Sequence, residues 1–147
     1  MKYLLVILLA TVGTVCRAQV PQKAQAAYND AIILDKQGKF KEALDKVKLA
    51  TDLYPKYYQA FALGGSIFRK FALHGDVIYC YRKALQIKPD YCQAYIDFAD
   101  FYKTSRNNID SSFIYLNKAV QYHCNDTSKA LNYSLGYYYN EKGKYDE

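Results

Sequence analysis

The sequence of 147 residues predicts an all-α fold, built as a solenoid of antiparallel helix pairs. A short segment with proline, glutamine and alanine at fixed places recurs every 34 residues, beginning at Pro21, Pro55 and Pro89. Between these prolines, apolar residues recur at helical spacing, and a glycine or polar segment interrupts each copy once. Such a period is typical of repeat architectures, in which each unit buries its apolar face against the next.

Residues 1–18 are set apart as a signal peptide. A short positive start precedes the segment 3–15, which is apolar or small throughout. A run of this length is short for a bilayer span and is typical of an export signal. Cys16 and Ala18 would be small residues at positions −3 and −1 relative to a signal-peptide cleavage site, so we expect cleavage after Ala18. A lipid-modified Cys16 is one alternative, and a retained first helix or membrane anchor is another.

The first repeat, about residues 24–57, indicates two helices. Glycine at position 38 allows the positive φ of a helix C-terminus, and Pro55 stops the second helix. Apolar residues follow helical spacing on both sides of this break: Ala27, Ala31 and Leu34 before it, and Phe40, Ala43, Leu44, Val47 and Ala50 after it.

The second repeat, about residues 58–91, departs from the first at its turn. Gly75 comes three residues later than expected, and His74 stands where the first copy has an aromatic residue. Gly64 and Gly65 lie inside the predicted first helix, where we expect them to allow close packing of a neighbouring helix.

The third and fourth repeats are less regular. The third, about residues 92–128, has one extra residue in its turn at 105–108, and Cys124 replaces the proline. The fourth, about 129–147, stops where its second helix should begin. We therefore expect the chain to be truncated at its C-terminus; the alternative is a natural short protein that borrows a helix from a partner.

The repeated residues resemble the tetratricopeptide repeat, a helix–turn–helix unit of the same length. This resemblance covers residues 22–147 and implies a right-handed superhelical solenoid of about 3.5 repeats. The matching residues are Ala31, Leu34, Gly38, Phe40, Ala43, Ala50 and Pro55 in the first copy, Phe61, Gly65, Phe68, Tyr81, Ala84 and Pro89 in the second, Tyr95, Phe98, Ala99 and Tyr102 in the third, and Leu135, Gly136, Tyr139, Gly143 and Tyr145 in the fourth.

The resemblance implies a concave groove lined by the first helix of each pair. Its mixed polar and aromatic composition suits an extended peptide or a partner helix. The family's groove positions fall here on Gln25, Tyr28, Asp35, Gln59, Ser66, Arg69, Gln93, Asp100, Lys103, Tyr133, Tyr137 and Asn140.

The three groove glutamines, Gln25, Gln59 and Gln93, form a ladder at the repeat interval. They would bond either a peptide backbone or helix N-terminal amides, and we favour the second interpretation. Family members that grip the C-terminal carboxylate of heat-shock chaperones use lysine, asparagine and arginine at four groove positions. Here those positions hold Tyr28, Ile32, Gln93 and Asp97, so we do not expect that role.

The sequence contains little that favours catalysis, a cofactor or a metal. The two histidines, His74 and His123, fall in a turn and a connector without metal-ligand spacing. Asp97 and Asp100 share a helix face, which we interpret as solvated. The net charge of +6 is spread without a basic stripe, so we expect no nucleic-acid partner. No further segment is apolar enough to cross a membrane.

Cys92 and Cys124 lie at comparable places one repeat apart. Adjacent first helices are expected about 8–10 Å apart, beyond the usual Cα separation across a disulfide. The longer connector around Cys124 could close this gap, so a disulfide and two free thiols both remain open. Cys80 is expected to fill space inside a helix.

Taken together, these features predict a non-enzymatic protein-binding or scaffold module of the cell envelope, in a Gram-negative periplasm. The alternative is the sensor or assembly arm of a longer protein whose C-terminal part carries an enzymatic or membrane domain. The sequence does not identify the partner.

Overall fold

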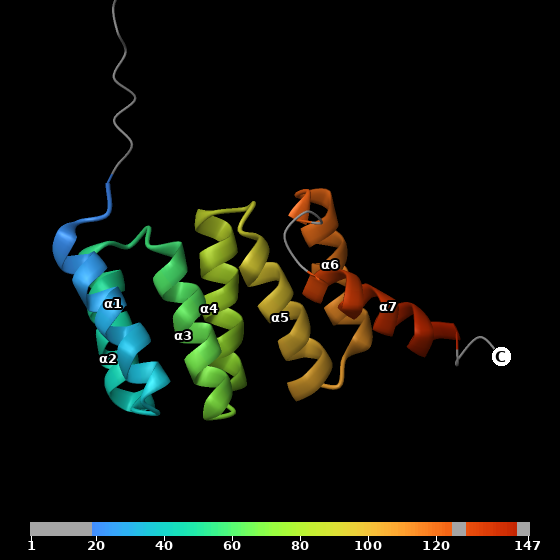
Figure 1. Ribbon diagram of the computed structural model, residues 1–147, viewed down its shortest axis with the longest axis horizontal. Helices are drawn as coiled ribbons and strands as arrows, with labels where there is room; N and C mark the ends of the chain where they lie inside the picture. The colour runs from blue at the N-terminus through green and yellow to red at the C-terminus, as the bar shows by residue number, and fades with distance from the viewer. Residues whose placement is uncertain (1–18, 125–128, 144–147) are drawn as a thin grey trace, which may run out of the picture.

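The computed structural model describes residues 19–124 and 129–143, and these form an all-α solenoid (Figure 1). The predicted signal peptide, the segment 125–128 and the last four residues lie outside the described residues. Seven helices and no strand occur within them: α1 (Gln22–Lys36), α2 (Phe40–Leu53), α3 (Tyr58–Lys70), α4 (His74–Ile87), α5 (Cys92–Ser105), α6 (Ile109–Gln121) and α7 (Lys129–Gly143). The all-α prediction is confirmed.

The helices pack as successive antiparallel pairs, α1 with α2, α3 with α4 and α5 with α6, and the pairs stand side by side in a row (Figure 1). Helix α7 follows α6 at the end of this row. Each helix has only 13 to 15 residues, a length at which an isolated helix is marginal in water. Packing against neighbours must therefore stabilise every helix.

Small residues make close contacts between helices, both inside a pair and between neighbouring pairs. Ala31 and Ala43, which face each other across α1 and α2, are fully buried. In α3, a Cβ added to Gly64 would lie 3.2 Å from Cγ1 of Val47, and one added to Gly65 would lie 3.1 Å from the ring of Tyr81. The glycine pair is thus a close-packing device, as its place in the helix suggested.

Gly136 has a different environment. A Cβ added there would have no neighbour within 4 Å. Helices α5 and α6 contact α7, but not at this position, so nothing in the described part of the chain requires glycine there.

Aromatic rings fill the space between pairs. Tyr81 of α4 stacks on Phe98 of α5 with ring centroids 5.2 Å apart, and within the third pair Phe98 also lies 4.3 Å from Tyr115 of α6. Phe113 of α6 stacks on Tyr138 of α7 at 3.7 Å. Such rings bury large apolar areas across helix surfaces that are only partly covered.

The turn inside each pair contains one residue in the left-handed conformation. Its φ is +75° at Gly38, +53° at Ala72 and +46° at Asn107. Gly75 does not take this place in the second turn and belongs to α4 instead. Only the first pair therefore uses the residue type that adopts positive φ without steric cost.

The third turn is one residue longer than the first, as the sequence spacing predicts. The N–H of Lys39 donates to the carbonyl of Leu34 at 2.9 Å, whereas the N–H of Asn108 donates to the carbonyl of Tyr102 at 2.9 Å. The side chain of Asn108 then accepts from the N–H of Ser111 at 2.8 Å and caps α6.

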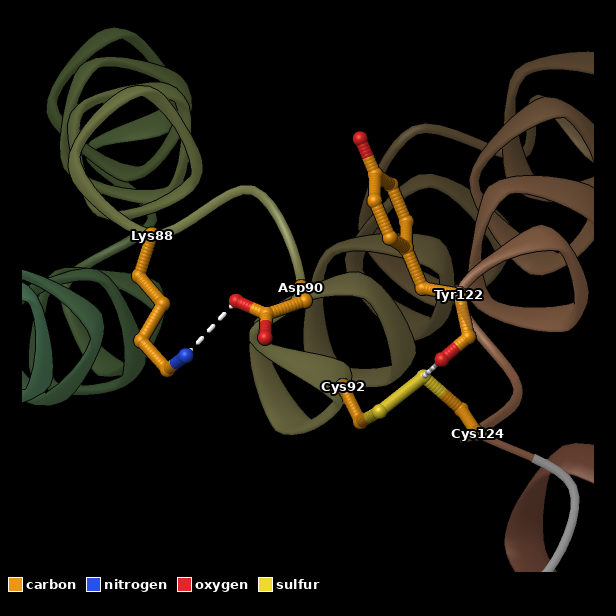
Figure 2. Close-up of a disulfide and its surroundings, with 5 residues drawn as sticks. All are labelled: Lys88, Asp90, Cys92, Tyr122 and Cys124. Atoms are coloured by element: carbon orange, nitrogen blue, oxygen red, sulfur yellow. Dashed lines mark hydrogen bonds and ion pairs between the residues drawn. A yellow bond between two sulfur atoms is a disulfide. The ribbon is translucent and has the colours of Figure 1, made fainter.

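A disulfide joins Cys92 to Cys124 (Figure 2). Cys80 is a buried free thiol. The two Cα atoms of the bridge lie 5.5 Å apart. This separation is shorter than the spacing of neighbouring helix axes because Cys124 follows the end of α6 and is not part of α7. The bridge ties the start of α5 to the connector beyond α6.

Exchanging glycine and alanine between the first two turns should change stability in opposite directions. Ala72→Gly should raise the free energy of unfolding by up to about 1 kcal/mol, because it relieves the left-handed conformation of alanine. Gly38→Ala should lower it by a similar amount, since a Cβ there meets nothing within 4 Å and the cost is purely conformational. Urea denaturation measures both, and changes of the same sign would contradict this account of the turns.

Enlarging a fully buried alanine should be far more harmful than enlarging an exposed one. Ala84→Leu adds volume to a site packed by Tyr81 and Ala94 and should cost about 1–3 kcal/mol. Ala26→Leu makes the same change on the exposed face of α1 and should cost less than about 0.5 kcal/mol. Equal denaturation midpoints for the two variants would be inconsistent with this packing.

Reduction of the Cys92–Cys124 bridge should lower the free energy of unfolding by roughly 3 kcal/mol, because the bridge reduces the conformational entropy of the unfolded chain. A reductant should shift the melting temperature of the native protein and of Cys80→Ala, but not that of a Cys92→Ser/Cys124→Ser variant. Alkylation of the unfolded, unreduced protein should label Cys80 while leaving both bridged cysteines unlabelled; labelling of either bridged cysteine would exclude the disulfide.

Candidate functional site

The first helices α1, α3 and α5 contact one another in sequence, and α5 contacts α7. This arrangement places the predicted groove residues of successive repeats next to each other on one face. The candidate site is therefore the surface formed by the first helices, which we call the first-helix face.

The charged residues of the first-helix face pair with one another. Asp35 of α1 forms an ion pair with Lys70 of α3. Arg69 of α3 donates to the carboxylate of Asp100 of α5 at 2.8 Å, and Nζ of Lys103 lies 3.8 Å from the same carboxylate. These ion pairs link three successive repeats, so the charges neutralise each other and also hold the face together.

Two of the three groove glutamines bond other side chains. Nε2 of Gln25 donates to Oδ1 of Asn29 at 3.0 Å, and its Oε1 accepts from the hydroxyl of Tyr57 at 2.9 Å. Nε2 of Gln93 donates to Oδ1 of Asp97 at 2.8 Å. A helix N-terminal N–H would donate to the side-chain oxygen, but Oε1 of Gln25 accepts from Tyr57, and no backbone N–H donates to Gln25 or Gln93 among the described residues. The interpretation that these amides satisfy helix N-termini is therefore wrong for both.

Gln59 and Ser66, both on α3, are half-buried, and no side-chain hydrogen bond is formed by either within the described residues. Gln59 lines an open depression of about 610 Å³ together with Val20, Tyr54 and Tyr58. These two side chains remain available to a ligand on the first-helix face.

Tyrosines gather at the end of the face where α1, α3 and α5 begin. The rings of Tyr28 and Tyr57 lie 5.0 Å apart, and those of Tyr58 and Tyr91 lie 4.8 Å apart. Burial raises the pKa of Tyr57 and of Tyr91 to about 12, so both hydroxyls stay protonated at neutral pH. Only Tyr28 of this cluster was expected in the groove.

Asp97 of α5 does not lie on a solvated face, contrary to the sequence-based interpretation. Burial raises the pKa of its carboxyl group, while the hydrogen bond from Gln93 and the charge of Arg69 oppose that rise. Asp97 is half-buried, and no ion pair is formed by its carboxylate in the part of the chain that the structure describes. The charge of Arg69 therefore acts on Asp97 without a direct ion pair.

The hydroxyl of Tyr81 lies close to the same place. Tyr81 belongs to α4, is fully buried, and its ring is held between Gly65 and Phe98. Its hydroxyl forms no well-aligned hydrogen bond within the described residues, and the guanidinium of Arg69 is the polar group beside it. Burial raises its pKa most, with Asp97 raising and Arg69 lowering it, so both charged groups of the first-helix face act on this hydroxyl.

The groove residues predicted on α7 are not gathered with the others, except for one. Nζ of Lys103 lies 4.9 Å above the ring of Tyr137 and connects α7 to α5. Tyr133 and Asn140 are exposed, and no side-chain contact joins them to the rest of the first-helix face in the described region.

Within the described residues, no group of histidine, cysteine and acidic side chains is arranged to hold a metal ion. No helix there is long and apolar enough to cross a membrane. His74 lies beside the ring of Phe101, and its Nδ1 is 3.3 Å from Nη1 of Arg106, an arrangement that joins the start of α4 to the end of α5.

No protein-family model matches the chain, and no curated protein matches it in sequence. Solved structures match it in fold. PilW, a widely conserved type IV pilus biogenesis factor, has a TM-score of 0.75 and 20% identity over 86% of this chain and 57% of that chain. MamA has a TM-score of 0.65 and 23% identity over 71% of this chain and 60% of that chain.

The chain thus spans less than two thirds of these two proteins. It spans nearly all of a smaller domain, TPR2B of yeast Sti1 in a complex with pHsp70, with a TM-score of 0.73 and 15% identity over 84% of this chain and 99% of that chain. Identities this low establish the fold alone. Together with helix pairs repeating every 34 residues, they show that the chain has the fold of tetratricopeptide-repeat domains.

Proposed function

We propose that the chain is a non-enzymatic protein-binding module of the cell envelope, and that the first-helix face binds an extended segment of a partner protein. The likeness to a domain solved in a complex with pHsp70 supports a protein ligand, and the likeness to a pilus biogenesis factor supports an envelope setting. The apolar segment 3–15 supports export, although it lies outside the described residues.

One observation carries this proposal. On the first-helix face, Arg69 and Lys70 form ion pairs with acids of neighbouring repeats. Gln59, Ser66 and the tyrosine rings remain available to contact a ligand. A surface of this kind offers hydrogen bonds and apolar ring area at little electrostatic cost. Those are the contacts that an extended backbone with mixed side chains requires.

The face is also held rigid before any ligand arrives. Arg69 contacts both Asp100 and Thr104 of the next repeat, and Lys70 contacts Asp35 of the previous one. A preformed surface loses little conformational entropy on binding, which favours affinity from a modest contact area.

Blocking the face should abolish peptide binding. Short random peptides displayed on phage would be selected on the folded protein, and their binding compared with that of two tryptophan variants. Ser66→Trp places a bulky ring in the middle of the face and should weaken binding by at least about tenfold. Lys41→Trp makes a comparable change on the exposed side of α2 and should have no effect.

Circular dichroism and melting temperature would establish that both variants remain folded. Peptides that bind equally well to both variants, or that lose binding to Lys41→Trp alone, would show that another surface is the binding site.

A further inference from the structure

We propose that Gln19 is the first residue of the exported protein and that its α-amine closes on its own side-chain amide to form an N-terminal pyroglutamyl residue. The closure removes a positive charge that disfavours the start of α1. This inference rests on the export part of the proposed function, because the α-amine of Gln19 becomes free only when the chain is cleaved after Ala18.

The reaction needs no group beyond Gln19 itself. The lone pair of the α-amine attacks the side-chain carbonyl carbon Cδ, a bond forms between these two atoms, and the bond from Cδ to Nε2 breaks. Nε2 leaves as ammonia and takes the proton that the amine loses. The product is a neutral lactam, so the chain loses the mass of ammonia and the positive charge of its N-terminus.

The structure leaves Gln19 accessible and fixes the residues that follow it. Val20 is half-buried and packs on the cluster that contains Ala24 and Tyr57. Pro21 precedes α1, and its carbonyl accepts from the N–H of Gln25 at 3.0 Å. Gln19 itself is exposed. Cleavage after Ala18 therefore leaves a free end of a single residue, whose amine and side chain can approach each other.

The start of α1 disfavours a positive charge at this end. The helix begins at Gln22, only two residues beyond Val20, and the N-terminus of a helix carries the positive end of its dipole. The first turn of α1 contains no acidic residue, no side chain caps it, and Lys23 adds a further cation. An ammonium group on Gln19 would be repelled there, whereas a lactam would not.

A second group of residues adds to this positive charge. Gln19 lines the open depression of about 610 Å³ together with Lys56 and Lys88. Lys88 is paired with Asp90, but Lys56 forms no ion pair among the described residues. The segment that carries Gln19 runs into α1 beside the connection between α2 and α3, which carries Lys56 (Figure 1).

The test uses the whole chain with its own N-terminal segment, produced in a Gram-negative bacterium and recovered from the periplasm. The purified protein is kept warm at neutral pH until its mass no longer changes. Mass spectrometry of the N-terminal peptide should find Gln19 first, with a mass about 17 Da below that of the unmodified peptide. An amine-reactive label should not attach to this residue, and pyroglutamyl aminopeptidase should remove it.

Two glutamine variants serve as controls. Gln19→Asn keeps an amide but has a shorter side chain, which would close only a smaller, strained ring, so this variant should keep an N-terminal amine that takes the label. Gln22→Asn makes the same change at an internal glutamine and should cyclise as the native protein does.

The effect on α1 is measured on the native protein before and after cyclisation. At low ionic strength, the cyclised form should melt about 1–3 °C higher than the form with a free amine, and about 1 M salt should remove the difference. Equal melting temperatures at low ionic strength would overturn the proposed effect on α1.

A chain that begins with an unmodified Gln19 after this treatment would overturn the inference and leave export standing. Cleavage before Cys16 with a lipid attached would also overturn it, and would leave the envelope setting standing. Recovery only of a chain that keeps residues 1–18 would overturn both the inference and the envelope setting.

Discussion

Close contact between the two helices of each pair, made through alanine and glycine, is the constraint on which the rest of the structure depends. Ala31, Ala43 and Ala84 are fully buried, and a Cβ on Gly65 would lie 3.1 Å from the ring of Tyr81. With the helices this close at these positions, large rings pack around them, as Phe98 does on Tyr115 within the third pair, and also between pairs. The stacked rings of Tyr81 and Phe98 are the result, and they bind one repeat to the next.

The first-helix face follows from the same constraint. Stacked pairs bring α1, α3 and α5 together, which allows Lys70 to reach Asp35 and Arg69 to reach Asp100. These ion pairs are partly exposed, so each contributes little stability by itself. Their larger effect is on the shape of the surface, since they connect α1, α3 and α5 side by side.

Much of the fold was predictable from the sequence because short local patterns specify where each helix begins and ends. The 34-residue interval and the breaks at Gly38 and Pro55 locate the helices, and the extra residue at 105–108 locates the longer turn. The second turn was harder, because Ala72 adopts a conformation that glycine usually marks. A strained alanine gives no signal in a sequence, and only the surrounding packing imposes it.

The site was less predictable than the fold. Helical spacing specifies which face of a helix a residue lies on, but not how deeply its side chain is buried or which groups it bonds. Gln25, Gln59 and Gln93 occupy equivalent positions, yet Gln25 and Gln93 each donate to a side chain one turn further along, whereas Gln59 forms no side-chain hydrogen bond among the described residues. Asp97 looks like a solvated acid in the sequence. Its burial becomes visible only when Tyr81, from another helix, is placed beside it.

The disulfide has a mechanical consequence. It joins the start of α5 to the connector after α6, so the chain between Cys92 and Cys124 forms a closed covalent loop (Figure 2). Tension applied along the chain from either side would pass through the sulfur bridge and bypass both helices of that pair. While the earlier pairs could be drawn out under load, the third pair would keep its length, and the residues Gln93, Asp97 and Asp100 would keep their positions on α5.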